Sequence, residues 1–284
     1  MFKVNRRRFL QLSGFAFAIT IPESLLAANS EKYAGIPMGV HGASFRQFSI
    51  EETLKTIVEE LGLNEIELTS AQIRLHGAPA DELATLADIR KLRRMLADAG
   101  VRATAYGFIP IGTDLEQNLR IFQSAQELEL RNLTVIPEEN PLDHLEELAD
   151  RFGIRLAIHN NAPGRAFDSM EQVYRALAGR GENIGACVDV GNVLRSNEDP
   201  AQAIRQLGEK VFGIHLKDVS SRSVDSDVIG LGEGVLDTEA FFAALRETDM
   251  PSDMACSLEY LARPTEPIPN MQRSLALAEE LLNR

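Results

Sequence analysis

The sequence predicts a single (β/α)8 barrel, and three observations lead to this prediction. Short apolar runs alternate with longer segments of helical period throughout residues 29–284, which is the pattern of parallel strands joined by helical crossovers. The length of this stretch suits one barrel of about 250 residues. Polar residues end most of the apolar runs, as expected where strand tips carry the chemistry of a barrel.

Each expected strand is short, apolar and bounded by polar residues or glycine. The strands cover residues 37–40, 65–68, 102–106, 132–136, 156–159, 184–189, 211–216 and 255–260.

An expected helix follows each strand, and several helices carry recognisable ends. Ser49 and Glu52 have the spacing of a capping box, while Gly62, Gly100 and Gly153 follow helices as C-terminal glycines. The helices cover residues 50–61, 81–99, 115–128, 142–152, 170–177, 201–207, 238–248 and 270–282.

Residues 1–28 are expected to be an export signal rather than part of the barrel. Four basic residues precede an apolar run from Phe9 to Ile21, and small residues end at Ala28, as in a cleavable signal. The run from Asn5 to Gln11 resembles a twin-arginine signal, with a general secretory signal as the alternative. No later apolar stretch approaches membrane-spanning length, so we expect a periplasmic barrel at residues 29–284.

The net charge of the protein limits the classes of partner that it can bind favourably. The formal net charge is −13, and loss of residues 1–28 removes four bases and one acid, which makes the mature chain more acidic still. Such a field repels nucleic acids and anionic membrane surfaces. We expect neither as a partner, and a neutral small molecule or a metal cation suits the charge better.

Three polar strand ends indicate a metal site. Asp189, His215 and Glu259 lie at the ends of the last three expected strands, which open onto one mouth of the barrel. Two carboxylates and an imidazole are suitable ligands for Mn²⁺, Mg²⁺, Co²⁺ or Zn²⁺. We therefore expect these side chains to hold one divalent metal ion.

Alternation along the strands places the neighbours of these ligands. Residues two apart share a face of a strand, so Cys187, Gly213 and Ser257 should point inward with the ligands, whereas Phe212 should face the helices. Cys256 should also face outward, on a strand that does not adjoin that of Cys187. Both cysteines are therefore expected to be free thiols.

Several motifs at the strand ends resemble those of a known family. They are Asp189–Asn192, Val211–Asp218, Leu231–Asp237 and Ser257–Tyr260. With them the sequence resembles the xylose isomerase-like TIM barrels, a family of sugar isomerases, ketose epimerases and inosose dehydratase with an AP-endonuclease branch. The resemblance covers nearly all of residues 29–284 and implies one divalent ion held by Glu, Asp, His and Glu on strands five to eight.

The fifth strand departs from that family pattern. It ends in His159 where the epimerases have a glutamate, so the fourth metal ligand is either His159 or Glu138, with Glu138 slightly preferred. The family's epimerases use their two metal-bound glutamates as an acid–base pair on opposite faces of the substrate carbon. In this sequence Glu259 and His159 are the candidates for moving the proton.

The resemblance implies a sugar isomerase or epimerase that removes a proton next to a metal-polarised carbonyl. Lys217 shares a face with His215 and is expected to bind a substrate oxygen or stabilise the enediolate, with a salt bridge to a mouth carboxylate as the alternative. Loss of a leaving group from the enediolate would instead make a lyase or dehydratase. A barrel that binds sugar without turnover is an alternative of another class. A repair nuclease is disfavoured by the acidity and the export signal.

The expected substrate is a non-phosphorylated sugar, because sugar phosphates stay inside cells and no arginine cluster ends the strands. Residues 219–234 form the longest irregular stretch and are expected to cover the substrate. The sequence leaves open whether the protein is a homo-oligomer. The candidate substrate-binding residues are Asn160, Asn192, Glu67, Tyr106 and His76, with His41 as a further pocket residue.

Overall fold

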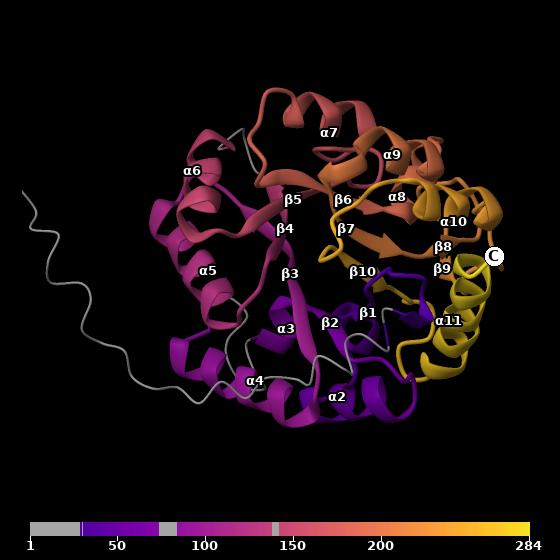
Figure 1. Ribbon diagram of the computed structural model, residues 1–284, viewed down its shortest axis with the longest axis horizontal. Helices are drawn as coiled ribbons and strands as arrows, with labels where there is room; N and C mark the ends of the chain where they lie inside the picture. The colour runs from indigo at the N-terminus through magenta and orange to yellow at the C-terminus, as the bar shows by residue number, and fades with distance from the viewer. Residues whose placement is uncertain (1–28, 30, 74–83, 138–141) are drawn as a thin grey trace, which may run out of the picture.

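Eight parallel strands close into a barrel, in the order β1-β10-β7-β6-β5-β4-β3-β2. This confirms the predicted single (β/α)8 barrel, and Figure 1 shows the helices arranged around the central strands. The computed structural model describes residues 29, 31–73, 84–137 and 142–284. The expected export signal at residues 1–28, His76, Glu138 and the first residues of the helix expected at 81–99 lie outside these ranges.

Except for the third strand, the barrel strands lie close to their expected positions. Two further short strands, β8 (Asp218–Val219) and β9 (Val228–Ile229), pair in antiparallel fashion after β7. The barrel strands are β1 (Met38–His41), β2 (Glu65–Leu68), β3 (Arg102–Ile111), β4 (Asn132–Pro137), β5 (Arg155–His159), β6 (Ile184–Asp189), β7 (Val211–Leu216) and β10 (Ala255–Leu258).

The helix ends follow the chemistry read from the sequence. Ser49 and Glu52 form the expected capping box on α2, and Gly62, Gly100 and Gly153 all have positive φ, the conformation that glycine adopts without steric cost. The helices are α2 (Ile50–Glu59), α3 (Ser70–Ile73), α4 (Leu86–Ala99), α5 (Leu115–Glu127), α6 (Leu142–Phe152), α7 (Met170–Leu177), α8 (Val190–Arg195), α9 (Pro200–Leu207), α10 (Thr238–Glu247) and α11 (Ile268–Leu282), with short 3-10 turns at Gly42–Phe45 and Gly208–Lys210.

Two elements near the barrel mouth differ from expectation. The strand β3 continues to Ile111 rather than ending at Tyr106, and its extension pairs with the end of β4. The helix α8 begins directly after Asp189, whose side chain accepts a hydrogen bond from the backbone N–H of Asn192. Asp189 therefore both ends a strand and caps a helix, which fixes the direction of its carboxylate.

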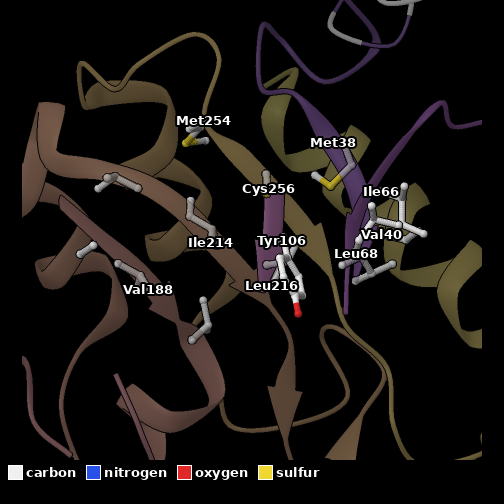
Figure 2. Packing of buried hydrophobic residues seen from close by; sticks show 14 of the residues in the cluster. Met38, Val40, Ile66, Leu68, Tyr106, Val188, Ile214, Leu216, Met254 and Cys256 are labelled. Atoms are coloured by element: carbon white, nitrogen blue, oxygen red, sulfur yellow. The ribbon is translucent and has the colours of Figure 1, made fainter. Parts of the chain in front are cut away.

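The apolar core lies largely between the strands and the helices. Val188, Ile214 and Cys256 belong to this buried cluster (Figure 2). Both Cys187 and Cys256 are buried free thiols, as expected. The alternating faces of β6, β7 and β10 thus separate an apolar outer layer from the polar barrel interior.

The expectation that Phe212 faces the helices is wrong. Pairing between β6 and β7 shifts by one residue, from Ala186 opposite Val211 to Cys187 opposite Gly213. Such a β-bulge leaves one residue unpaired and bends the strand locally, which changes where side chains point. Phe212 consequently joins a small separate cluster with Ala157 and Cys187. Alternation read from the sequence misses this bulge because it assumes an unbroken strand.

The segment expected to be an irregular loop, residues 219–234, is tied to the barrel by Asp218. The buried Asp218 carboxylate accepts hydrogen bonds from the backbone N–H groups of Gly232, Gly234 and Leu236 at 3.0–3.1 Å. The adjacent β8 and β9 give the segment regular structure. Across the parts of the chain that the structure describes, no helix combines the length and apolar character needed to cross a membrane.

Candidate functional site

Buried polar side chains gather at the carboxyl ends of the barrel strands. His159 ends β5, Asp189 ends β6, and His215 is the penultimate residue of β7. Glu259 follows β10, where its backbone N–H donates to the carbonyl of Leu216. All four side chains are buried, so the closed barrel brings together residues that lie far apart in the sequence.

His159, Asp189 and His215 form a compact group of three potential ligand atoms. His159 Nε2 lies 3.1 Å from His215 Nδ1 and 3.2 Å from Asp189 Oδ2. His215 Nδ1 lies 3.8 Å from the same Asp189 oxygen. Nitrogen and oxygen ligands about 2.0–2.1 Å from a tetrahedral zinc ion would lie about 3.4 Å apart. The spacing of these three atoms therefore fits a small divalent cation.

Asp189 is oriented by its backbone surroundings. Its Oδ1 atom accepts a 2.9 Å hydrogen bond from the backbone N–H of Asn192, which leaves Oδ2 directed toward the two histidines. Asn160 fixes the backbone of Asp189 by donating to its carbonyl and accepting from its N–H. The side-chain amide of Asn160, expected to bind substrate, thus holds Asp189 in place, and the side-chain amide of Asn192 donates to the backbone carbonyl of Asn160.

Lys217 lies between two carboxylates. Its Nζ is 2.8 Å from Asp189 Oδ2 and also pairs with Glu259 Oε2. Burial alone would lower the pKa of Lys217, but Asp189 and Glu259 together raise it above its usual value. Burial conversely favours protonation of Glu259, yet the charge of Lys217 holds the pKa of that carboxyl below its usual value. Both groups are therefore ionised at neutral pH.

Gly191 leaves room for the stem of Lys217. A Cβ atom at this position would lie 2.9 Å from both Cγ and Cδ of the lysine and 3.1 Å from Val219. Real Cβ contacts are longer than this, so a larger residue would displace the lysine or the neighbouring strand. The glycine in the Asp-Val-Gly-Asn motif consequently has a packing role beside the site.

Glu67 supports His215 from inside the barrel. Its Oε1 lies 3.1 Å from His215 Nε2 and accepts a bond from Thr134, while Oε2 accepts one from Ser257. A carboxylate on the outer nitrogen of a histidine commonly fixes the ring and its tautomer at metal sites. This contact directs Nδ1 of His215 toward Asp189 and His159. Glu67 is fully buried and thus orients a site residue rather than reaching the mouth.

His41 and His215 differ in how their surroundings shift the pKa of the imidazole ring. Burial lowers the pKa of His41 to about 4, so this ring is neutral, and its Nδ1 accepts from the N–H of Ala43. Burial alone would also lower the pKa of His215. The effects of Cys187, Glu67 and Asp189 are larger, and they raise that pKa well above its usual value. A cation at His215 would compete with a proton for the ring, which makes binding pH-dependent.

A second group of potential ligand atoms overlaps the first. His41, Glu67 and His215 also lie close enough to surround one ion, and the rings of His41 and His215 are 4.5 Å apart at their centres. His41 Nδ1 is 3.8 Å from Glu259 Oε1. The structure thus offers two overlapping three-residue groups that share His215.

Some predicted site residues lie away from these groups. Tyr106 is buried in the apolar core, with its hydroxyl 3.2 Å from Ser70 Oγ. Glu259 stands beside Lys217 and His41, outside both three-residue groups. Glu138 and His76 fall outside the described residues, and their places remain predictions.

Phe108 is a residue at the site that the sequence reading did not single out. Its ring packs edge-on against His159, with centroids 4.9 Å apart, although the side chain is 43% exposed. The extension of β3 carries it there. The apolar run that continues past Gly107 is the signal that could have indicated this longer strand.

Comparison with known proteins agrees with the barrel fold. Residues 56–281 match the model of the family described as xylose isomerase-like TIM barrel. The chain belongs to this family. No curated protein sequence gives a match.

Solved structures of other members of this fold cover most of the chain. A zinc-bound IolI protein has 15% identity and a TM-score of 0.67, covering 87% of this chain and 98% of its own. A probable 3-DHS dehydratase, AsbF from Bacillus anthracis, has 14% identity and a TM-score of 0.66, with 84% and 97% covered. An L-ribulose 3-epimerase has 18% identity and a TM-score of 0.61, with 87% and 95% covered. At such identities these likenesses show the shared fold alone.

Proposed function

We propose that this protein is a divalent-metal-dependent isomerase or epimerase of a non-phosphorylated sugar, acting in the periplasm. The observation that carries the proposal is the Glu259 carboxylate, paired with Lys217 beside a metal-sized group of ligand atoms. Family membership supports the reaction class, since similar structures include an L-ribulose 3-epimerase. The location rests on the export signal predicted at residues 1–28, which lies outside the described residues.

Each residue has a distinct part in this proposal. His159, Asp189 and His215 are suited to hold the cation, which when bound would polarise a substrate carbonyl and acidify the adjacent C–H bond. Glu259 is the candidate base for that proton, and its ion pair with Lys217 keeps it ionised. Lys217 is also placed to stabilise negative charge on the enediolate oxygen. Glu67 keeps His215 in position through their 3.1 Å contact.

Two features support a neutral substrate. Among the buried polar residues that the structure describes, Lys217 is the single lysine or arginine, and two carboxylates already neutralise it. A phosphate group usually requires arginine or lysine partners that are available for it. The acidity of the whole chain also disfavours an anionic substrate.

A lyase is the second candidate, and the residue at the end of β5 favours it. Epimerisation by two carboxylates on opposite faces is the family pattern, but His159 replaces one of them and points toward Asp189 and His215. Elimination needs one base together with a means of assisting the leaving group. Glu259 alone could serve as that base, and the likeness to a probable dehydratase is compatible with it.

Proton exchange in deuterated water distinguishes these functions. Metal-loaded protein is incubated with neutral aldoses, ketoses and 3-keto-glycosides and followed by NMR. Deuterium at carbon with an intact skeleton identifies an isomerase or epimerase, whereas an unsaturated product identifies a lyase. Saturable binding with neither change would identify a sugar-binding barrel and refute the catalytic proposal.

A further inference from the structure

The charges buried at the barrel mouth do not balance. Two buried carboxylates, from Asp189 and Glu259, share the ammonium of Lys217, which is the single buried lysine or arginine among the described residues. Unpaired charge is costly to bury. One ammonium does not neutralise both carboxylates, and a bound cation would supply the remaining positive charge. Protonated imidazoles are the competing source of positive charge.

The two oxygens of Asp189 show where a cation would lie. Oδ1 is occupied by the backbone N–H of Asn192, and Oδ2 faces the two histidines on one side and Lys217 on the other. His159 contributes Nε2 to this space, while its ring is held against Phe108. The histidine side of Asp189 Oδ2 is thus the place with suitable ligands.

Lys217 separates Glu259 from that place. The ammonium pairs with Glu259 Oε2 and Asp189 Oδ2 at once, and the other oxygen of Glu259 faces His41. Asp189, His215 and Glu259 do not form one of the metal-sized groups among the described residues. An ammonium therefore stands where Glu259 would otherwise approach a cation at Asp189.

We propose that the metal binds to His159, Asp189 and His215, with Lys217 keeping Glu259 out of the ligand set. The ion would lie among β5, β6 and β7, and Glu259 would remain available to act on substrate. Two imidazoles and one carboxylate favour borderline ions such as Zn²⁺ or Co²⁺ over Mg²⁺, which prefers oxygen ligands. The inference deepens the proposed function and rests on it for the reaction, but metal binding is measurable without substrate.

The test compares two histidines that are equally buried and both pack against His215. Chelator-stripped full-length protein is titrated with Zn²⁺ and with Mg²⁺ against a chromophoric competitor. The expected result is preference for Zn²⁺ and a loss of more than about tenfold in Zn²⁺ affinity for His159→Gln. His41→Gln and Glu259→Gln should each lose less Zn²⁺ affinity than His159→Gln, since neither removes a ligand.

Three results would overturn this assignment. Loss of Zn²⁺ affinity in Glu259→Gln but not in His159→Gln would mean that Glu259 is a ligand, as in the family pattern. Loss of Zn²⁺ affinity in His41→Gln, with affinity retained in His159→Gln, would show that the ion binds to the group that contains Glu67. Failure of the wild type to bind either ion would mean that protonated imidazoles balance the charge.

A measurement on the wild type covers the case in which a variant does not fold. Cooperative thermal unfolding of each variant is checked first, and X-ray absorption at the zinc edge then counts imidazole ligands in the loaded wild type. Two imidazoles are expected, and one would refute the proposal. Zinc bound in this way without proton exchange would refute the proposed reaction alone.

Discussion

The two ends of the barrel carry charged residues of very different kinds. At the amino-terminal ends of the strands, Asp253 pairs with Arg131 at 2.7 Å and with Arg155 at 2.6 Å, and the Arg131 side chain is 69% exposed. At the opposite mouth, Asp189, Glu259 and Lys217 are almost completely buried. One set of ion pairs touches water and the other does not.

This difference distinguishes ordinary surface ion pairs from charged groups that take part in the chemistry of a site. Exposed ion pairs contribute little to stability and are readily tolerated on a surface. Buried charges cost free energy unless they are fully paired, so groups of them in a barrel mouth point to function. Active sites of barrels of this kind lie at the carboxyl ends of the strands, which is where the buried charges occur here.

The largest expected effect comes from removing the candidate base at the mouth. Glu259→Gln should lower the rate of proton exchange by about 10²–10⁴-fold, the usual contribution of a positioned acid–base group. The measurement is exchange at substrate carbon in deuterated water, with circular dichroism to show that the variant is folded. An unchanged rate would assign the base to another residue.

Removing the ammonium tests how the buried charges are balanced. Lys217→Met in metal-free protein leaves Asp189 and Glu259 facing each other without their shared partner. Loss of one partner from a buried pair costs about 3–5 kcal/mol, and urea unfolding should report a decrease of that size in the free energy of unfolding. A decrease below 1 kcal/mol would show that water reaches the pair.

A third prediction concerns pH and His41. Burial lowers the pKa of this histidine from 6.5 to about 4, so between these values the unfolded chain binds a proton that the folded protein does not. The contribution of His41 to the stability of metal-free protein is therefore complete above pH 6.5 and falls by up to a few kcal/mol as the pH drops toward 4.

The matching variant isolates the contribution of that one histidine. His41→Gln should flatten the dependence of unfolding free energy on pH in this window, whatever its effect at neutral pH. Denaturant unfolding at several pH values measures the slope. Equal slopes for the two proteins would mean that His41 is accessible to protons in the folded state.

The smallest effect is expected at the other end of the barrel. Arg131→Ala removes one partner of Asp253, while Arg155 still pairs with it. The free energy of unfolding should fall by less than about 1 kcal/mol, and proton exchange should stay at the wild-type rate. A large loss of activity from this variant would break the distinction between the two ends.

Much of the fold was predictable because its signals are local. The helix start at Ser49 and Glu52 depends on residues three apart, and the glycine ends depend on backbone conformation at single positions. The bulge at Phe212 was not predictable in this way, since it arises from pairing between β6 and β7. The short helix α8 was missed because it begins inside the motif that also ends β6.

The sequence predicted which residues form the candidate site, but not which of them contact one another. Strand ends identified Asp189, His215, Glu259, His159 and Lys217, because every parallel strand of a barrel opens onto the same mouth. Their contacts depend on how far each strand projects and on which way each side chain turns. Phe108 was missed for the same reason, since the extension of β3 carries it to His159.

The sequence by itself determined a (β/α)8 barrel with acidic and histidine side chains at one mouth. The alternation of strands with helices and the ends of the strands are local patterns, which depend on residues close together in the chain. Only the tertiary structure decided that Lys217 bridges Asp189 and Glu259 and that Glu67 supports His215 from within. These contacts join residues from different strands. Their geometry is set by closure of the barrel, which no local pattern in the chain specifies.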